Sequence, residues 1–364
     1  MLQCAAFKRY VSKLKVFAKR TIQDPSKLSK VLHDAYNVDF HRDELFTFYS
    51  NSDKGSSLKI AIHALASLLV DHQRNLIVSR NLYAALVLGV IFRKPLVFET
   101  HQIEFGFRGF FQKAIIQCDH IVTVVISQKL LELLSEHHEV NLRQPLVLHD
   151  AAIAEENPTS PSLRRRDLHE LLGSDVNEWS HVCGYFGHLY YGRGIEIIEA
   201  MAKKRPEFLF LVYGGNDSEV LRRKNLNKQK NLRFMGFVPH PLAKKVMKAV
   251  DSLLMPYQEK VSIGAPGHDT GEWMSPMKMF EYMSTGVPII SSNLPVLREV
   301  LVNRKNAILV KPSDVDDWLA GLDSLHADPA LSSRIGEQSF KDLQERYTWK
   351  ARAKAILEAG KRLF

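Results

Sequence analysis

The residues with the clearest potential for chemistry lie in SPMKMFEYMSTGVPII, which is residues 275–290. Lys278 and Glu281 stand three positions apart, so they would lie on one face of a helix. Free backbone N–H groups and the dipole at a helix N-terminus favour anions, and the pair therefore indicates a phosphate site. The alternative, from the residues alone, is an i,i+3 salt bridge on a solvated face.

Four residues mark the ends of that predicted helix. Ser275 is a good N-cap, Pro276 suits the first helical position, and Gly286 and Pro288 indicate the end. The apolar run at 287–290 is expected to be a buried parallel strand. The apolar face of the helix is expected to pack into a core and carries Met277, Phe280 and Met283.

A second candidate anion site is the glycine-rich turn in GYFGHLYYGRGIEII, residues 184–198. Glycines such as Gly187 and Gly194 allow a backbone to approach an anion closely, and Arg193 can bind a diphosphate with two parallel hydrogen bonds. The helix expected to begin near Gly194 would add its own N-terminus. The turn matches neither a Walker loop nor the GxGxxG order, and a purely structural turn is the alternative.

Two further loops follow predicted strands. Gly214 and Gly215 lie near the end of LVYGGN, where the lack of side chains would leave backbone groups accessible to a ligand. The alternative is a plain strand-to-helix turn. The loop MGFVPHP, residues 235–241, has backbone groups that could meet a nucleobase edge, and the alternative is a loop with no ligand.

His101 is the candidate for proton transfer. It follows Glu99 at the end of the predicted strand 95–100, where it could also bind a developing negative charge. The alternative is a structural histidine. The remaining histidines show no metal-ligand spacing, and the sequence contains no GxSxG, HExxH or paired CxxC, so no metal site is predicted.

The elements that would position these residues form an α/β pattern. From about residue 45, short apolar runs alternate with amphipathic segments, which predicts parallel sheets with helices on both faces. The alternation stops in a Pro, Ser and Arg-rich stretch and then resumes, which predicts two tandem Rossmann-like domains. Ligands are expected beyond the carboxyl ends of the strands and in the cleft between the domains. The predicted parts are an N-terminal domain at 1–150, a linker at 151–178, a C-terminal domain at 179–346 and a closing helix at 347–364.

The amino-acid composition limits the classes of binding partner that the protein is expected to have. The chain has 364 residues, of which 45% are hydrophobic and 24% charged, and its net charge of +9 favours an acidic or phosphate-bearing partner. Nucleic acid is disfavoured because the basic residues are dispersed and no binding module is present. Three scattered cysteines, no spanning stretch and no secretory signal in residues 1–20 indicate a cytoplasmic protein. In residues 7–20, apolar and basic residues at roughly helical spacing predict an amphipathic helix, lying on an anionic membrane or packed on its own domain.

Four stretches in this order resemble the family-four retaining glycosyltransferases of GT-B architecture. The resemblance covers about residues 75–362 and rests on YFGHLYYGRGIE, GFVPHP paired with SLLMPY, SPMKMFEYMSTGVPIISSNLPVLREV, and RYTWKARAKAIL. It implies a nucleotide-diphosphate sugar donor, transfer of the sugar to an acceptor hydroxyl with retention, and no metal or other cofactor. It also implies a closing helix that packs back towards the N-terminal domain.

The resemblance implies a role for each candidate residue. Glu281 would bind the ribose hydroxyls, Arg193 would neutralise the departing diphosphate, and His101 would lie near the donor sugar and acceptor. Lys278 joins His101 and Arg193 as the implied catalytic set. The implied donor-binding set also contains Gly187, His188, Gly194, Gly214, Gly215, Phe237, Val238, Met274, Ser275 and Met277.

The chain departs from the family pattern at three places. Trp273 stands eight positions before Glu281, where the family usually has a first glutamate, and His188 replaces the usual arginine. Both changes fit a subgroup that carries SPxK before its glutamate. The first glycine is Gly55, and no first strand with a glycine turn is predicted in residues 1–44. Either the chain begins inside the first domain, or this unit is rebuilt from the basic N-terminal segment.

The implied function is a glycosyltransferase of cell-surface glycan, polysaccharide or glycolipid synthesis. Its acceptor would be a glycan or a lipid-linked molecule at the inner face of a membrane, with peripheral contact to anionic lipid. One alternative is a catalytically weak nucleotide-sugar-binding protein, and another is a nucleotide-sugar epimerase or hydrolase on the same architecture.

Overall fold

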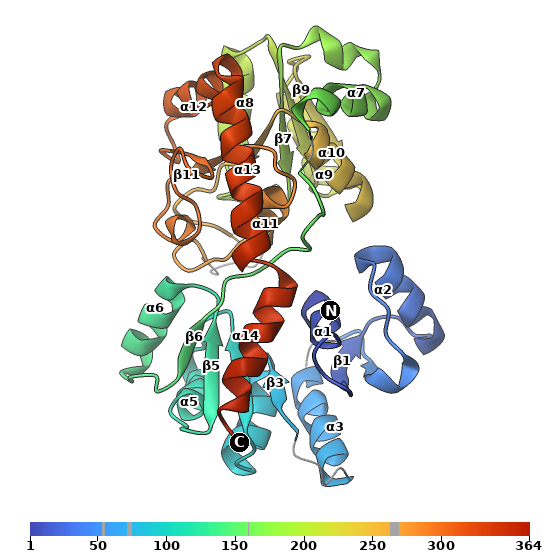
Figure 1. The fold of residues 1–364 in the computed structure, drawn as a ribbon, viewed down its shortest axis with the longest axis vertical. Helices are drawn as coiled ribbons and strands as arrows, with labels where there is room; N and C mark the ends of the chain where they lie inside the picture. The colour runs from blue at the N-terminus through green and yellow to red at the C-terminus, as the bar shows by residue number, and fades with distance from the viewer. Residues whose placement is uncertain (53–54, 71–74, 159, 263–268) are drawn as a thin grey trace. The chain divides into compact units, whose positions relative to one another are not determined.

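A computed structural model describes residues 1–52, 55–70, 75–158, 160–262 and 269–364 (Figure 1). The chain divides into two compact units. The first unit contains residues 1–149 together with 349–364, and the second unit contains residues 150–348. Each unit is an α/β structure around a parallel sheet, which confirms the predicted α/β fold with two Rossmann-like parts.

The first unit is built on a four-stranded parallel sheet in the order β3-β4-β5-β6. These strands are Ile77–Ser79, Leu96–Thr100, Ile121–Val125 and Pro145–Val147. The helices around it are α4 (Leu82–Ala84), which continues as a π-helix over Ala85–Ile91, α5 (Gly106–Ile116), α6 (Gln128–His138) and α14 (Trp349–Lys361). Every residue of β4 and β5 is buried, as expected for strands covered on both faces. Ser127 is the N-cap of α6, because its Oγ accepts the Leu130 N–H at 3.1 Å.

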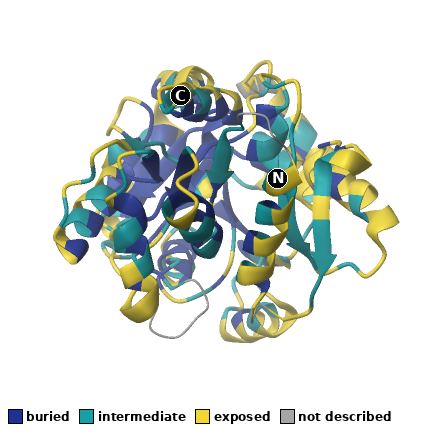
Figure 2. Cartoon of the chain, turned by 90° about the horizontal axis from the view of Figure 1, so that it is seen from below, coloured by how far each residue is buried: buried dark blue, intermediate teal, exposed yellow. Residues whose placement is uncertain are grey.

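The N-terminal segment of the first unit differs from the sequence prediction. Its elements are α1 (Leu2–Phe7), β1 (Val16–Arg20), α2 (Leu28–Tyr36), β2 (Leu45–Tyr49) and α3 (Ser56–Val70). The predicted amphipathic helix at 7–20 is wrong, because α1 ends at Phe7 and β1 pairs in parallel with β2 in a separate two-stranded sheet. Residues 1–44 therefore do supply a first strand, although without a glycine turn. Figure 2 shows that this two-stranded ribbon is mostly half-buried.

The second unit is built on a six-stranded parallel sheet in the order β12-β11-β10-β7-β8-β9. Its strands are β7 (His181–Phe186), β8 (Phe208–Tyr213), β9 (Leu232–Gly236), β10 (Ser252–Met255), β11 (Ile289–Ser292) and β12 (Ile308–Val310). The strand order reverses between β7 and β10, so this is the topological switch point where such sheets bind ligands.

Helices cover both faces of that sheet. One core contains buried side chains of α7 (Pro161–Leu172), α10 (His240–Ala249) and α11 (Met277–Met283). The opposite core contains buried side chains of α8 (Ile195–Lys204) and α12 (Val315–Ala327), and α9 (Asp217–Leu226) packs beside it. Helix α13 (Pro329–Arg346) contributes to both cores. The segment 151–178, predicted as a linker, belongs to the second unit and carries α7.

Candidate functional site

Two glycines shape the edge of the sheet at the switch point. Gly187 follows β7 with φ +151°, and Gly214 follows β8 with φ +108°. A Cβ on Gly214 would lie 2.1 Å from the carbonyl oxygen of Gly187, so no side chain fits there. The Gly187 N–H donates to the Tyr213 carbonyl at 3.0 Å. The two strand ends are therefore packed backbone against backbone, and Gly215 lies against Leu189 beside them.

The turn after β7 holds Arg193 in a fixed position. Its flanking glycines, Gly192 and Gly194, approach the Lys260 and Pro256 carbonyl oxygens so closely that a Cβ would lie 1.8 Å away. The Arg193 guanidinium donates to Tyr257 Oη at 2.8 Å and to the Ser262 carbonyl at 3.2 Å. Gly194 adopts φ +72° as the N-cap of α8, which confirms the predicted helix start. Among the described residues, Arg193 Nε is buried without a hydrogen-bond partner.

Lys278, in the first turn of α11, reaches the same place. Its Nζ lies 4.2 Å from the Tyr185 ring centroid and 4.8 Å from that of Tyr257, on which the Arg193 guanidinium also lies at 5.1 Å. A Cβ on Gly187 would come within 2.8 Å of Nζ. Within the described ranges Lys278 Nζ has no hydrogen-bond or ion-pair partner, so the alternative of a Lys278–Glu281 salt bridge is not formed.

The electrostatics of this pair of cations favour an anion. Burial lowers the pKa of Lys278 well below its usual value, and the nearby charge of Arg193 lowers it further, while Glu281 opposes the shift. The two aromatic rings offer their negative faces but no full charge. A bound anion would relieve the repulsion between the two cations and raise the pKa of Lys278 again.

Glu281 is paired with His240, the first residue of α10. His240 Nε2 lies 3.1 Å from Glu281 Oε1, and this hydrogen bond, more than the opposing burial, raises the pKa of His240. The carboxylate of Glu281 is 27% exposed, so one side of it is accessible. In the preceding loop Phe237 is 81% exposed and Val238 packs against the core.

The start of α11 differs from the sequence prediction. The N-cap is Pro276, with φ −74° and ψ 121°, and Ser275 makes no cap; its Oγ instead accepts the Asp150 N–H at 2.9 Å. Met277 is 44% exposed rather than in the core, because the buried face of this short helix is formed by Met279, Phe280, Tyr282 and Met283. Met274, just before the helix, is buried.

His188, after β7, is exposed, and its ring stacks on that of Tyr190 with the ring centroids 4.7 Å apart.

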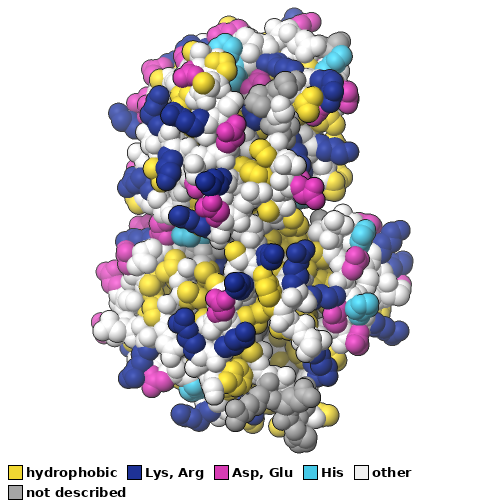
Figure 3. Space-filling view, viewed as in Figure 1, with side chains coloured by type: hydrophobic (Ala, Val, Ile, Leu, Met, Phe, Trp, Pro, Cys, Tyr) yellow, Lys and Arg dark blue, Asp and Glu magenta, His cyan; other side chains and the backbone are white. Residues whose placement is uncertain are grey.

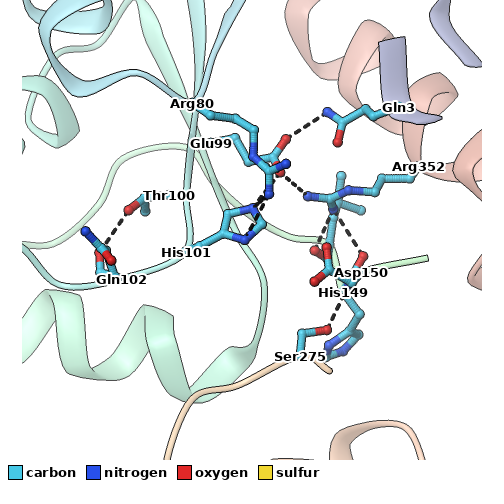
Figure 4. A network of polar contacts seen from close by, with 11 residues as sticks. Gln3, Arg80, Glu99, Thr100, His101, Gln102, His149, Asp150, Ser275 and Arg352 are labelled. Atoms are coloured by element: carbon cyan, nitrogen blue, oxygen red, sulfur yellow. Dashed lines mark hydrogen bonds and ion pairs between the residues drawn. The ribbon is translucent and has the colours of Figure 1, made fainter. Parts of the chain in front are cut away.

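His101 belongs to the first unit and lies in a polar network around Glu99 (Figure 4). The Glu99 side chain is fully buried, with His101 Nε2 at 2.8 Å, Arg352 at 2.7 Å and Arg80 Nε at 3.2 Å from its Oε1. Gln3 donates to Oε2 at 2.8 Å. Burial alone would raise the pKa of Glu99, but the His101 hydrogen bond and the two arginines hold it well below its usual value.

This network orients the His101 ring. The Nε2–H donates to Glu99, and a terminal nitrogen of Arg80 contacts both ring nitrogens. The carboxylate thus selects the tautomer of His101, as carboxylate partners of catalytic histidines do.

In the described part of the chain no group of three or more His, Cys, Asp or Glu side chains could hold a metal ion. Likewise, no helix described here has the length and apolar composition to cross a bilayer.

Comparison with known proteins identifies the part of the chain that carries the switch point. Residues 177–342 match the family described as "Glycosyl transferases group 1". This segment is a glycosyl transferases group 1 domain. It lies entirely within the second unit and contains Arg193, Lys278, Glu281 and the loop with Phe237.

Two curated relatives match parts of this chain. An uncharacterized glycosyltransferase of Methanocaldococcus jannaschii, MJ1607, is 27% identical over 184 residues, which are 49% of this chain and 44% of that protein. An uncharacterized glycosyltransferase of Haemophilus influenzae is 22% identical over 230 residues, which are 62% of this chain and 57% of that protein. The matched part spans about half the length of these relatives.

Solved structures resemble the whole chain. Anabaena Alr3699/HepE in complex with UDP has a TM-score of 0.71 at 17% identity, covering 99% of this chain and 94% of that one. Sucrose-phosphate synthase from Thermosynechococcus elongatus has a TM-score of 0.72 at 17% identity, covering 100% and 92%. At such identities the likeness establishes the fold, which is the α/β fold of GT-B glycosyltransferases.

Sequence reasoning missed several residues of the glycosyl transferases group 1 domain and of the first unit. Tyr185 contacts Lys278, and Tyr257 contacts both Lys278 and Arg193. Each tyrosine lies at or just after the end of a buried strand, and a polar group at such a position could have indicated a site residue. His240 lies in the predicted base loop, but its pairing with Glu281 has no counterpart in the local pattern. Arg352 is 253 positions from Glu99, and no local pattern links them either.

Proposed function

We propose that the protein is a glycosyltransferase that binds a nucleotide-diphosphate sugar at the switch point of the second unit. The observation that carries this proposal is the convergence of Arg193 and Lys278 on the Tyr257 ring, with no carboxylate partner for Lys278 among the described residues. Lys278 Nζ stands beside Gly187, at the glycine edge where a diphosphate could approach the backbone. The match to the glycosyl transferases group 1 family supports the same assignment.

The reaction we propose is transfer of the sugar to an acceptor hydroxyl with retention and without a metal. The leaving diphosphate gains negative charge as the glycosidic bond breaks, and Arg193 and Lys278 are placed to stabilise that charge. Because these side chains are held by Tyr185, Tyr257 and Ser262 before a ligand binds, little reorganisation is needed. We assign the acceptor proton to the departing diphosphate, in line with the resemblance to retaining relatives of the SPxK subgroup.

We propose a uridine nucleotide as the first donor to test, because the similar Anabaena HepE structure is a complex with UDP. Glu281 would hydrogen-bond the ribose hydroxyls, and its pairing with His240 would keep the carboxylate ionised and oriented. The base would lie on the loop with Phe237 and Val238. The remaining donor contacts are assigned to Gly187, His188, Gly194, Gly214, Gly215, Met274, Ser275 and Met277.

The first unit is assigned to the acceptor side, with a glycan or lipid-linked acceptor in cell-surface glycan, polysaccharide or glycolipid synthesis. One of the similar structures is WaaG, a glycosyltransferase involved in lipopolysaccharide biosynthesis, which supports testing such acceptors first. We further propose a cytoplasmic protein in peripheral contact with the inner membrane face. His101, oriented by Glu99, is the proposed catalytic residue of this unit.

The experiment that tests the proposal is a thermal-shift panel of UDP, ADP, GDP and their sugars. One nucleoside diphosphate is expected to raise the melting temperature of the wild type, and Lys278→Met is expected to abolish that shift. Arg222→Met, an exposed cation on α9 of the same unit, is the matched control and should respond as the wild type does. If no nucleotide stabilises the wild type, or if Lys278→Met responds equally, the proposed site is wrong.

A catalytically weak nucleotide-sugar-binding protein is the second candidate. The observation that favours it is the engagement of both His101 ring nitrogens within the first unit. The transferase should release free nucleoside diphosphate only when an acceptor is present, whereas the binding protein should be stabilised without any release. An epimerase or hydrolase would turn over the donor with no acceptor.

A further inference from the structure

The first unit carries a pocket that the proposed function does not use. It has a volume of about 520 Å³ and lies between the β1–β2 ribbon and α3. This volume is in the range of sites that hold small molecules. Its described lining residues are Lys13, Lys15, Phe17, Phe46, His63, Ser67 and Val70.

The sequence builds this pocket with two regular spacings. Lys13, Lys15 and Phe17 alternate along the segment that leads into β1, and side chains two apart lie on the same side of an extended chain. The α3 side carries residues four and three apart, which share one face of a helix. The basic and apolar alternation of residues 7–20 is thus explained by a pocket wall, not by a membrane-bound helix.

One part of the pocket is aromatic and exposed. Phe17 and Phe46 are paired in the ribbon and stack with ring centroids 5.1 Å apart. Phe46 nevertheless remains 40% exposed, and Val70 at the pocket edge is 82% exposed. Burying such surface under a ligand stabilises a complex by roughly 25 cal/mol per Å² of apolar area. The aromatic pair therefore favours a ligand with an apolar portion.

The other part of the pocket is cationic. Lys15 Nζ lies 3.2 Å from Ser67 Oγ and 5.9 Å from the Phe46 ring centroid, and within the described ranges Lys13 has no polar partner. No aspartate or glutamate is among the described lining residues. The surrounding sequence has the same bias, because residues 1–23 contain many Lys and Arg residues and no Asp or Glu. In Figure 3, basic side chains border hydrophobic ones on the unit that carries β1 and α3.

The cationic and aromatic pattern continues along the ribbon. Phe48, two residues after Phe46, stacks on His63 with centroids 5.7 Å apart, and Lys59 lies over the Phe48 ring at 5.9 Å. Lysines thus stand beside phenylalanines at two successive positions on one side of β2. A free phosphate would contact the lysines but leave Phe46 and Val70 in water. A neutral lipid would cover the apolar surface but bring no negative charge to the lysines.

We propose that this pocket binds an amphipathic phosphate, in which a phosphate group contacts Lys13 and Lys15 and an apolar chain lies on Phe17, Phe46 and Val70. The proposal concerns the first unit alone, so it does not depend on nucleotide binding in the second unit. Phosphorylated lipids, whether dispersed or in a bilayer, have this chemistry.

Calorimetric titration of the full chain with short-chain phosphatidic acid, kept below its micellar concentration, tests the proposal. Inorganic phosphate and the matching short-chain diacylglycerol are the comparison ligands. We expect phosphatidic acid to bind at least about tenfold more tightly than either, because each comparison ligand lacks one of the two contacts. Lys13→Ala with Lys15→Ala should weaken it by about tenfold or more, since two charge-assisted contacts are lost.

The matched control is Lys27→Ala with Lys30→Ala, which removes the same charge near α2 of the same unit. It should bind phosphatidic acid as the wild type does. Phe46→Ser should weaken phosphatidic acid and leave any response to inorganic phosphate unchanged, and the melting temperature of each variant verifies folding. Equal binding by the Lys13 and Lys15 variant, equal affinity for inorganic phosphate, or no binding by the wild type would each overturn the proposal. Vesicles with and without phosphatidic acid show whether the same pocket also takes the lipid from a bilayer.

Discussion

Two clusters of cations in this chain have opposite surroundings. In the first unit, Arg80 and Arg352 point at the fully buried carboxylate of Glu99. In the second unit, Arg193 and Lys278 lie on the rings of two tyrosines, and Glu281, three positions after Lys278, is paired with His240 instead. The first arrangement is electrostatically complete and supports the fold. In the second, no ion pair with a carboxylate is formed by Arg193 or Lys278 among the described residues, and we therefore propose that the ligand binds there.

The largest expected effect is on stability in the first unit. Arg352→Met leaves Glu99 buried with fewer partners and should lower the free energy of unfolding by about 3–5 kcal/mol. Urea denaturation measures this. Lys354→Met, on the exposed face of the same helix, should change it by less than about 0.5 kcal/mol. Adding Glu99→Gln to Arg352→Met removes the buried charge and should recover part of the loss; no recovery would mean that packing of Arg352, not its charge, stabilises the unit.

A smaller effect is expected from pH, because His181 of the second unit is held neutral. Burial lowers the pKa of His181 to about 4, while the unfolded chain would protonate near 6.5. A histidine with a lowered pKa destabilises the fold as pH falls below 6.5, by up to about 1.4 kcal/mol per pH unit until its folded pKa is reached. Glu99 has a lowered carboxyl pKa, so its contribution is lost only below the ordinary carboxyl range.

We therefore predict that wild-type stability falls between pH 6.5 and 5, and that His181→Gln reduces this fall by about 2 kcal/mol. His138, whose pKa burial also lowers to about 4, should account for part of the remaining slope. His169→Gln, an exposed histidine of the second unit, is the control. An unchanged slope in His181→Gln would show that His181 is not held neutral.

The smallest stability effect is expected at Lys278. A partly buried cation without a described partner contributes little to the fold, so Lys278→Met should leave the free energy of unfolding unchanged or raise it by up to about 1 kcal/mol. Arg352→Met, in contrast, is expected to lower the free energy of unfolding. Urea denaturation of the ligand-free protein measures both changes. A clear loss of stability in Lys278→Met would show that Lys278 stabilises the fold, as the cations around Glu99 do in the first unit.

The same contrast explains what the sequence could predict. Runs such as LFTFY and FLFLVY and the glycines after them are local signals, and the strands and strand-end turns of both units follow them. The start of α8 at Gly194 and the cap of α6 at Ser127 were likewise predictable, because each depends on a few neighbouring residues.

Features that depend on distant partners could not be predicted. Strand β1 is only half-buried and is specified by pairing with β2, so its basic and apolar alternation resembled a helix. Ser275 lost its predicted capping role because its hydroxyl accepts the Asp150 N–H from another segment. The contact of Lys278 with two tyrosine rings also needs two strand ends and one helix to come together.

We assign diphosphate binding to Arg193 and Lys278, which have no carboxylate partner in the described part of the chain, and not to the cations around Glu99. Titration calorimetry with UDP on the wild type, Lys278→Met, Arg193→Met and Arg80→Met tests it most directly. We expect a dissociation constant at least about tenfold higher for Lys278→Met and for Arg193→Met, because each substitution removes a charge-assisted contact. For Arg80→Met we expect an affinity within about twofold of the wild type, because the described partners of Arg80 are Glu99 and His101 of the first unit. Wild-type affinity in Lys278→Met and Arg193→Met would contradict the account.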